Sequence, residues 1–180
     1  MTELGLLGPE NTYHDMARQK FMPNASHVLF HSFDDVFIAL KEKRIKKALI
    51  AIKNNTSGLV GDNLERIKIS GHRILEQFEL PIHLCLGSFK APNIESIKKI
   101  YSHPMAIKET KKFFVKYSHI TFISSTSTVS AIHELKNTRE KNPGVIASKE
   151  AIEANDLMLL SENIEDHSTN STTFALVENA

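Results

Sequence analysis

The run NIEDHSTNSTTFALV, residues 163–177, decides how the chain closes on itself. Its first part is rich in Asn, Asp and Ser, which favour turns. Its last part, Thr173 to Val177, predicts a short β-strand that returns the chain to a sheet. A polar loop before a C-terminal strand can place Asn170 and Thr172 beside loops made much earlier in the chain. Their amide and hydroxyl groups can orient a small polar ligand, or they can form only a solvated turn.

Upstream of this run, apolar strand-like segments alternate with helical periodicities. In the first part of the chain, strands are predicted at residues 4–7, 28–30 and 48–52, and helices at 12–21, from Ser32 onward, and at 59–67. Two extended runs follow at 73–80 and 81–86. Beyond them, strands are predicted at 97–101, 120–123, 145–147 and 157–160, and helices at 105–115, 129–135 and 148–154. This alternation predicts an α/β fold with a largely parallel sheet.

Composition excludes several classes of protein. The 180 residues fit one domain or two small lobes, and 41% are hydrophobic, which is enough for a packed core. Lys and Arg number 22 against 21 Asp and Glu, so no overall field attracts nucleic acid or a membrane surface. The single cysteine, Cys85, lies in an apolar run and predicts a buried, inert thiol. Met1 to Glu3 begin no signal peptide, and no apolar run reaches the ~20 residues of a membrane helix. We expect a soluble, cytoplasmic protein.

Four polar turns follow predicted strands, at residues 8–12, 53–58, 102–104 and 124–128. Ligands of open α/β sheets bind at the carboxyl ends of strands, and helix starts attract anions. The turns therefore predict a small anionic ligand held between two lobes, although Ser, Thr and Asn also serve as ordinary helix caps. Nine histidines are present, but none has a zinc-site companion set, so no metal is expected.

Several segments, taken in order, resemble the catalytic domain of prephenate dehydratases. Gly8 to Tyr13 resemble the family's Gly-Pro-x-Gly-Thr opening, 52–58 its Ile-Glu-Asn-Ser-x-x-Gly loop, and 170–174 its Asn-x-Thr-Arg-Phe motif. The other matching segments are 32–37, 80–83, 101–104, Ser125-Thr126 and 146–148. The resemblance covers nearly the whole chain, and its specificity lies in the order of the motifs.

The resemblance implies two α/β lobes hinged around a cleft like a type II periplasmic binding protein. The first lobe would comprise residues 1–79 plus 162–180 and the second 80–161. The family converts prephenate to phenylpyruvate with loss of water and carbon dioxide, without a metal or an organic cofactor. Thr172 matches the threonine that assists departure of the ring hydroxyl. The residues implied to bind substrate are Thr12, Lys53, Asn54, Asn55, Thr56, Ser57, Ser102, His103, Ser125, Thr126, Asn170, Thr173 and Phe174.

Five positions depart from the family pattern. Thr173 replaces an arginine, Lys53 a glutamate, Asn55 a serine, Asn11 a glycine and Met105 a glutamine. Asn11 can still adopt a positive φ. We hypothesise that Lys53 supplies the missing cation if its side chain points inward, as a point charge in place of a planar guanidinium. Lys53→Ala should then raise the Michaelis constant strongly.

The sequence is compatible with three functions. The first is a prephenate dehydratase, with arogenate as an alternative substrate. The second is a prephenate decarboxylase, which keeps the ring hydroxyl and protonates a ring carbon; the change at Thr173 leaves it open. The third is a binding module without chemistry. Family members usually continue into a phenylalanine-sensing ACT domain, and the sequence ends at Ala180 without one. We therefore expect a stand-alone catalytic domain without feedback control in cis, which can form a homodimer.

Overall fold

The computed structural model describes residues 4–179, which divide into two compact units. Unit 1 comprises Met1–Pro81 and Asn170–Ala180, and unit 2 comprises Ile82–Thr169. The sequence placed the second boundary earlier, between residues 161 and 162. The segment after it stays with unit 2 because Ile164 N donates to Leu84 O at 2.8 Å and Leu84 N donates to Glu165 Oε2 at 2.9 Å. The expected lack of a signal peptide at Met1 to Glu3 concerns residues outside the described range.

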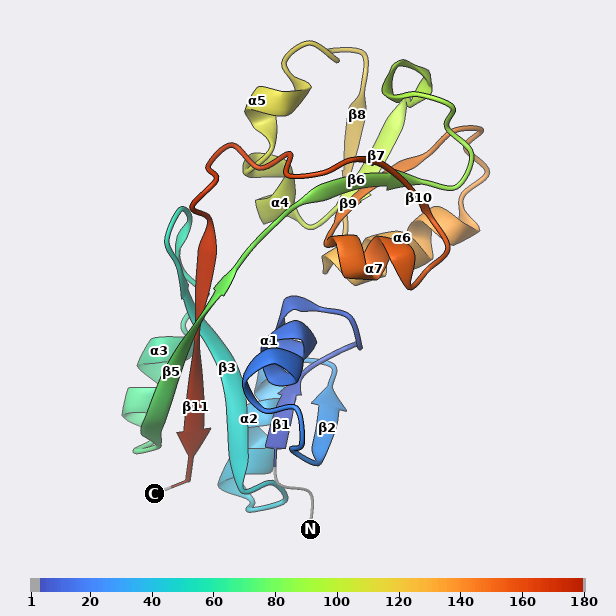
Figure 1. Ribbon diagram of the computed structural model, residues 1–180. Helices are drawn as coiled ribbons and strands as arrows, with labels where there is room; N and C mark the ends of the chain where they lie inside the picture. The colour runs from blue at the N-terminus through green and yellow to red at the C-terminus, as the bar shows by residue number, and fades with distance from the viewer. Residues whose placement is uncertain (1–3, 180) are drawn as a thin grey trace. The chain divides into compact units, whose positions relative to one another are not determined.

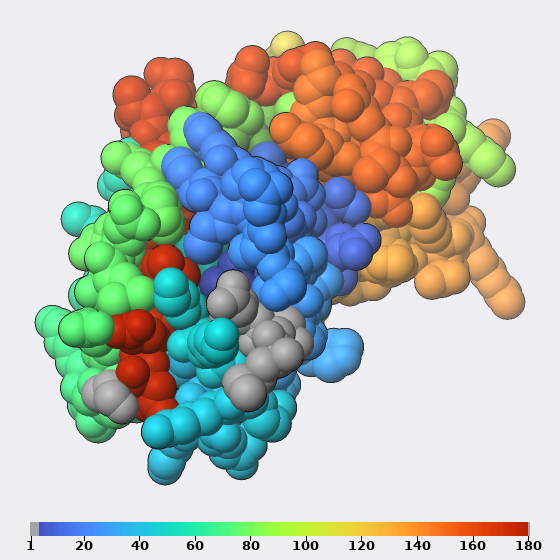
Figure 2. Space-filling view, turned by 60° about the horizontal axis from the view of Figure 1, so that its bottom comes forward, coloured from blue at the N-terminus to red at the C-terminus, as the bar shows by residue number. Residues whose placement is uncertain are grey.

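Unit 1 is built on one mixed sheet with the strand order β2-β1-β3-β11-β5 (Figure 1). β1 pairs in parallel with β2 and β3, whereas β11 lies antiparallel between β3 and β5. Figure 2 shows this C-terminal strand in dark red between green and cyan neighbours. The strands are β1 (Leu4–Leu7), β2 (His27–Phe30), β3 (Lys47–Asn54), β4 (Gly58–Leu59), β5 (Arg73–Pro81) and β11 (Ser171–Glu178). The predicted return of the C-terminal strand to the first lobe's sheet is confirmed.

Helices cover both faces of this sheet. α2 (Phe33–Lys41) and α3 (Asn63–Ile69) bury Val36, Phe37, Leu40 and Ile67 against alternate residues of β3 and β11. Ser32, where this helix was predicted to start, caps α2, because its side chain accepts from Asp35 N. On the other face lies α1 (Tyr13–Phe21), whose ring contact with β11 comes from His14.

Three predictions for unit 1 need correction. The sheet is mixed and not largely parallel, because β11 enters it antiparallel and β4 forms a hairpin with β3. The helix predicted at 59–67 begins only at Asn63, since Leu59 belongs to β4 and Gly58 takes the positive φ of 91° that the turn requires. In α1 the expected apolar side of Tyr13, Met16, Ala17 and Phe21 is fully buried only at Ala17, and the other buried residues are His14 and Asp15.

Unit 2 has its own sheet, with the order β10-β6-β9-β7-β8. Its strands are β6 (Cys85–Ser88), β7 (Lys99–Ser102), β8 (Thr121–Ser124), β9 (Gly144–Ala147) and β10 (Met158–Ser161). β7 is parallel to β8 and β9, while β6 is antiparallel to both β9 and β10. This sheet is therefore also mixed. The helices are a 3₁₀ turn (Ile94–Ser96), α4 (Pro104–Lys108), α5 (Lys111–Phe114), α6 (Thr128–Asn137) and α7 (Lys149–Glu153).

The core of unit 2 lies between its sheet and α6 and α7. Ile132 and Leu135 of α6 and Ile152 of α7 pack against Val145 and Ala147 of β9. Ser148 caps α7, as predicted.

Two predictions for unit 2 need correction. The helix expected at 105–115 is divided into α4 and α5, because the Thr110 hydroxyl bonds to Ala106 O at 2.9 Å where α4 ends. The extended run expected at 81–86 becomes strand only from Cys85.

Candidate active site

One edge of the unit 1 sheet gathers three polar segments. β1 and β3 run parallel, so their carboxyl ends, Leu7 and Asn54, lie at the same edge. β11 runs antiparallel to β3 and begins at that edge with Ser171. The predicted proximity of Asn170 and Thr172 to a much earlier loop is confirmed: Asn54 Nδ2 lies 2.8 Å from Asn170 Oδ1 and 3.1 Å from Thr172 Oγ1.

A β-bulge sets the faces on which these side chains lie. Thr173 pairs with Lys53 and Phe174 pairs with Ala51, so Ile52 is the extra residue of β3. Side chains alternate along β11, which puts Thr172 and Phe174 on one face and Thr173 on the other. Directly paired residues share a face. The bulge therefore brings Asn54 to the face of Thr172, and Lys53 to the opposite face with Thr173.

The amide of Asn54 is the centre of the polar cluster. Backbone N–H groups can only donate, so the approach of Thr56 N and Ser57 N, each at 2.9 Å, identifies the accepting atom as Oδ1. The hydroxyls of Thr56 and Ser57 contact the same oxygen at 2.6 and 3.0 Å. The amide nitrogen must then face Asn170 and Thr172. Asn54 is buried, at 7% exposure, so its orientation is held by contacts on both ends of the amide.

This orientation determines the role of the Thr172 hydroxyl. Since Asn54 Nδ2 donates, Thr172 Oγ1 accepts, and the hydroxyl keeps its own single hydrogen for another acceptor. Among residues 4–179 the structure gives no acceptor for that hydrogen. Thr172 is 9% exposed and Asn170 is 2% exposed. The arrangement presents a directed hydrogen-bond donor.

His14 and Phe174 form the apolar side of this region. Phe174 is fully buried, and its ring meets the His14 imidazole edge-on with centroids 5.0 Å apart. His14 Nε2 accepts from Ala51 N at 3.3 Å, on the part of β3 that extends past its pairing with β1. Burial lowers the pKa of His14 from 6.5 to about 4, so the ring is neutral at pH 7. His14 was not predicted from the sequence; its position two residues after the Thr12 cap was the available signal.

Thr12 serves its own helix. Its hydroxyl donates to Pro9 O at 3.0 Å and accepts from Asp15 N at 3.4 Å, so it caps α1 as predicted. Asn11, at the place of the family's glycine, has the expected positive φ, here 63°. The Thr12 hydroxyl is therefore engaged within the loop that follows β1.

Asn55, the residue after β3, pairs with Ser171, the first residue of β11. Asn55 N donates to Ser171 O at 3.0 Å, and Ser171 N donates to Asn55 Oδ1 at 2.9 Å. The Ser171 hydroxyl donates to Glu79 of β5. These contacts hold the start of β11, and with it Thr172, in a fixed register.

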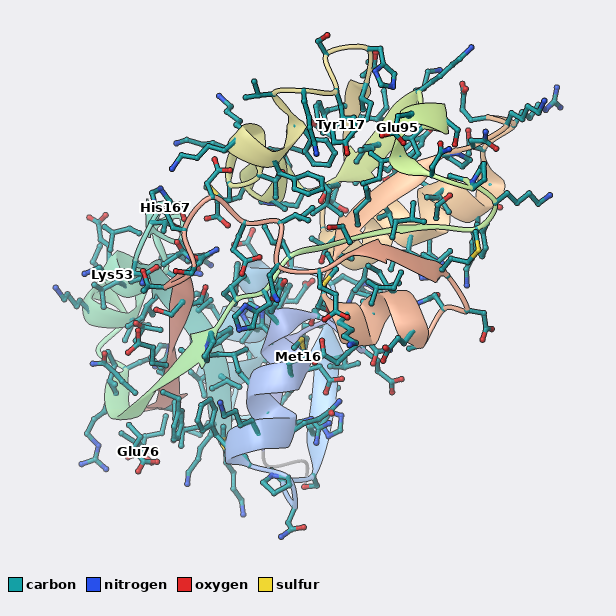
Figure 3. All side chains as sticks on the ribbon, turned by 45° about the horizontal axis from the view of Figure 1, so that its top comes forward. Met16, Lys53, Glu76, Glu95, Tyr117 and His167 are labelled. Carbon is teal, nitrogen blue, oxygen red and sulfur yellow. The ribbon has the colours of Figure 1, made fainter. Side chains whose placement is uncertain are left out.

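The Lys53 side chain does not point inward, as the hypothesis that it replaces the missing cation requires. Its side chain is exposed on the face opposite Thr172, and Figure 3 shows it on the outer side of its unit, apart from Met16 of α1. Thr173, where the family has arginine, lies on that same face between Lys53 and Glu79. Both departures from the family pattern are thus removed from the Asn54–Thr172 cluster.

In unit 2 the carboxyl ends of β7 and β8 also carry polar residues. Ser102 is fully buried, and its hydroxyl donates to Ile146 O at 2.7 Å. Ser125 N donates to Ser102 O at 2.8 Å, and the Ser125 hydroxyl donates to Glu134 at 2.9 Å. The two loops are joined through these serines.

His103 and Thr126 lie next to them at helix starts. His103 Nδ1 accepts from Met105 N at 3.2 Å and caps α4, and burial lowers its pKa. Thr126 is exposed and its hydroxyl donates to Ser130 of α6 at 3.1 Å. The hydroxyls of Ser102, Ser125 and Thr126 therefore each have a partner inside unit 2.

Three further features bear on the expectations from sequence. Cys85 is buried, as predicted, and burial raises the pKa of its thiol. Within residues 4–179 no group of three or more His, Cys, Asp or Glu side chains is arranged to hold a metal ion. In the same part of the chain, every helix is too short or too polar to cross a membrane.

The chain is similar to known prephenate dehydratases in sequence and in fold. The family model for prephenate dehydratase matches residues 4–180. A prephenate dehydratase from Lactococcus lactis subsp. cremoris is 28% identical over 177 residues, covering 97% of this chain and 63% of that protein. The crystal structure of a prephenate dehydratase from Arthrobacter aurescens in complex with L-Phe superposes with a TM-score of 0.88 at 20% identity, covering 99% of this chain and 60% of that one. A periplasmic substrate-binding protein from Coxiella burnetii has a TM-score of 0.51 at 10% identity, covering 99% and 84%.

The structural matches confirm the predicted fold class, an α/β fold of the periplasmic-binding-protein type. The chain spans between 43% and 63% of the length of the first curated relatives that it matches. The family match covers every described residue, including Asn54 and Thr172. The chain belongs to the prephenate dehydratase family.

Proposed function

We propose that this chain converts prephenate to phenylpyruvate, with loss of water and carbon dioxide. Membership of the family supports the reaction type. The observation that carries the proposal is the direction of the Thr172 hydroxyl, which accepts from Asn54 and can donate its hydrogen elsewhere. A dehydration requires a donor beside the departing oxygen, and Thr172 has that chemistry.

In the proposed reaction two bonds break in the substrate ring. The bond to the ring carboxylate breaks and releases carbon dioxide, and its electron pair completes the aromatic ring. The C–O bond breaks at the other end of the ring, and the leaving hydroxide takes a proton to become water. Thr172 donates a hydrogen bond to that departing oxygen as negative charge develops on it. Asn54 holds the Thr172 hydroxyl in the donating orientation, and Asn170, Thr56 and Ser57 hold Asn54.

The alternative decarboxylase activity has less support than it had from the sequence. It rested on the change from arginine to Thr173, and Thr173 lies on the strand face opposite Thr172. The change therefore leaves the Asn54–Thr172 pair intact. We keep the remaining candidate residues of unit 2, Ser102, His103, Ser125 and Thr126, as proposed substrate contacts.

The test follows the products directly. The purified chain is incubated with prephenate at neutral pH, and phenylpyruvate and carbon dioxide are measured together, beside a sample without protein and a sample with Thr172→Ala. We expect equal amounts of both products from the wild type and a strong loss in the variant. Carbon dioxide without phenylpyruvate would identify a decarboxylase. Neither product, with ligand-induced thermal stabilisation, would identify a binding module. Arogenate in place of prephenate, with phenylalanine as product, tests the second substrate.

Three properties of the whole protein are also proposals. We propose a cytoplasmic location, a small anionic substrate with no nucleic-acid or membrane partner, and a homodimer. The near balance of charge, +1 overall, supports the absence of a nucleic-acid partner. Light scattering after size-exclusion chromatography tests the oligomeric state, and a mass of 20.3 kDa would show a monomer.

A further inference from the structure

A cavity lies in unit 2, away from the edge that carries Ser102 and Ser125. It has a volume of about 500 Å³, within the range of small-ligand pockets. Its walls are the residues after β6, the end of α6 and the loop that leads into β9. They comprise Phe89, Lys90, Leu135, Lys136, Thr138, Glu140, Lys141, Asn142 and Pro143. Since this loop precedes Gly144, the cavity lies at the start of β9, opposite the carboxyl ends of β7 and β9.

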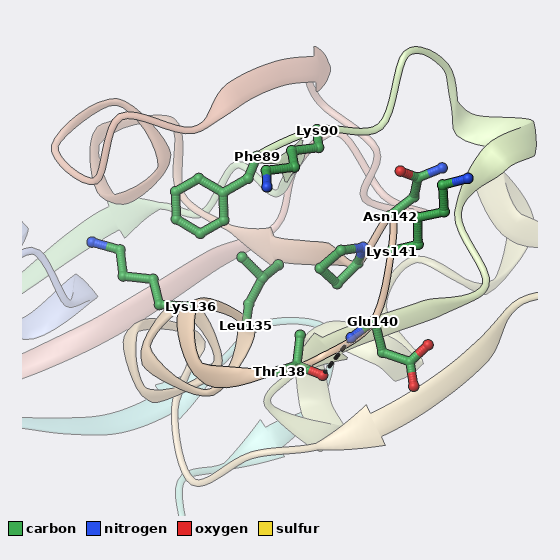
Figure 4. Close-up of a pocket in the computed structure, with 9 residues that line it drawn as sticks. Phe89, Lys90, Leu135, Lys136, Thr138, Glu140, Lys141 and Asn142 are labelled. Atoms are coloured by element: carbon green, nitrogen blue, oxygen red, sulfur yellow. Dashed lines mark hydrogen bonds between the residues drawn. The ribbon is translucent and has the colours of Figure 1, made fainter.

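The walls of this cavity are held in place by buried contacts. Ser88 is fully buried, and its hydroxyl donates to Pro143 O at 2.7 Å and accepts from Ala91 N at 3.1 Å. This single side chain joins the wall after β6 to the wall before β9. Thr138 Oγ1 accepts from Tyr101 Oη at 3.1 Å and from Glu140 N at 3.3 Å, the latter drawn in Figure 4. The cavity is therefore formed before any ligand arrives.

The charge of the lining is positive. Lys90, Lys136 and Lys141 contribute three ammonium groups, and Glu140 is the one carboxylate among the lining residues. Glu140 is already paired with Lys99. Lys136 donates to the neutral Asn155 Oδ1 at 2.8 Å, and within residues 4–179 neither Lys90 nor Lys141 has an ion-pair partner. Like charges around one cavity repel each other, and an anion in their midst removes that cost.

The floor of the cavity is apolar. Leu135 and Pro143 are buried, and the Phe89 ring is only partly covered. Figure 4 shows Phe89 and Leu135 beside each other, with the ammonium ends of Lys136 and Lys141 on opposite sides of them. Lys136 Nζ lies 6.0 Å from the centre of the Phe89 ring. A flat apolar body can stack on Phe89 while a negative group reaches the lysines.

We propose that this cavity is a second binding site, for a small aromatic carboxylate. The ring of the ligand packs on Phe89, Leu135 and Pro143, and its carboxylate bonds to Lys90 and Lys141. The site is independent of the reaction proposed for Thr172.

The test uses phenylacetate as the probe and the ¹⁵N-labelled chain as the detector. Amide NMR shifts separate this cavity from the Thr172 region, because Phe89, Lys90 and Asn142 report on one and Asn170, Ser171 and Thr172 on the other. We expect saturable shifts at Phe89 and Asn142 with a dissociation constant of about 1 mM or below. The double variant Lys90→Gln/Lys141→Gln should weaken this binding about tenfold, since two exposed charges are lost.

Two controls make the outcome decisive. Lys98 is an exposed lysine of the same unit outside the cavity, and Lys98→Gln should leave the affinity unchanged. Benzyl alcohol, which has the ring without the charge, should bind more weakly than phenylacetate. The proposal is overturned if shifts saturate only around Thr172, if the double variant binds as tightly as Lys98→Gln, or if benzyl alcohol binds equally well. These readouts need no turnover, so failure here is distinct from failure of the proposed reaction.

Discussion

The two units carry similar polar residues at the carboxyl ends of their strands and use them differently. In unit 1 a single amide, Asn54, joins loops that are more than a hundred residues apart in the chain and directs the Thr172 hydroxyl. In unit 2 the hydroxyls of Ser102 and Ser148 bond to backbone groups of their own fold. The same residue types thus form a directed donor in one unit, and helix caps or hydrogen bonds between segments in the other. The difference lies in the donor to each hydroxyl: the side-chain amide of Asn54 donates to Thr172, whereas a backbone N–H donates to Ser148.

The largest expected effect is at the directed donor. Thr172→Ala should lower kcat by about 10²–10⁴-fold with little change in KM, because a hydrogen bond to the leaving oxygen is lost. Thr172→Ser keeps the hydroxyl and should stay within about tenfold of the wild type. Steady-state kinetics with prephenate measures both variants. An alanine variant that retains more than half of the activity would remove Thr172 from the mechanism.

The next effect is on stability and comes from the buried imidazole beside the donor. The pKa of His14 is lowered from 6.5 to about 4 by burial, so the unfolded chain takes up its proton at a higher pH than the folded one. Stability should therefore fall as pH drops from about 6.5 to about 4, by roughly 3 kcal/mol. Urea unfolding at several pH values gives the profile.

His14→Gln is the control for this profile, because Gln can still accept from Ala51 N but does not titrate. The difference between the two profiles isolates His14 from the other histidines, including His103, whose pKa is also lowered. Parallel profiles for wild type and variant would show that His14 is not the group responsible.

A smaller effect is expected for a capping serine of unit 2. Ser148→Ala removes the acceptor of Ala151 N and should lower the free energy of unfolding by about 1 kcal/mol. It should leave kcat within about twofold of the wild type, since this hydroxyl accepts from Ala151 N as the cap of α7. Chemical denaturation and the kinetic assay are run on the same preparation. A loss of kcat without a loss of stability would show that Ser148 acts in the reaction, and the contrast with Thr172 would then be wrong.

The smallest effect is expected at Lys53. Because its side chain lies on the strand face opposite Thr172, Lys53→Ala should change KM by less than about twofold. This reverses the expectation from sequence, which gave Lys53 the role of the missing cation. Lys47→Ala, at an exposed position of the same strand, is the matched control. A KM that rises strongly for Lys53→Ala alone would restore the sequence-based hypothesis.

The sequence predicted those parts of the site that follow from the order of strands and polar loops along the chain. The polar loop before the C-terminal strand indicated that Asn170 and Thr172 would meet an early polar turn, and they meet Asn54 at the end of β3. Most strands, the caps Thr12 and Ser148, and the helix start at Ser32 also followed from local patterns. Local propensity is enough for such features, because each cap bonds within its own helix.

The faces of β3 could not be predicted in the same way. Strict alternation places Lys53 with Leu49 and Ala51, on the side of α1. The bulge at Ile52 reverses this order, and it is defined only by the register with β11. The role of His14 could not be predicted for a similar reason, since its partner Ala51 N belongs to a distant strand. Features fixed by long-range pairing thus required the structure.

The most direct test of the central claim is a double-mutant cycle on kcat with Asn54→Asp and Thr172→Ala. Aspartate keeps the acceptor for Thr56 N and Ser57 N but replaces the donor to Thr172, so the Thr172 hydroxyl would turn its hydrogen toward the carboxylate. We expect Asn54→Asp to lower kcat by about 10–100-fold when Thr172 is present and by less than about threefold in the Thr172→Ala background. The same loss in both backgrounds would contradict the account, because Asn54 would then act independently of the Thr172 hydroxyl.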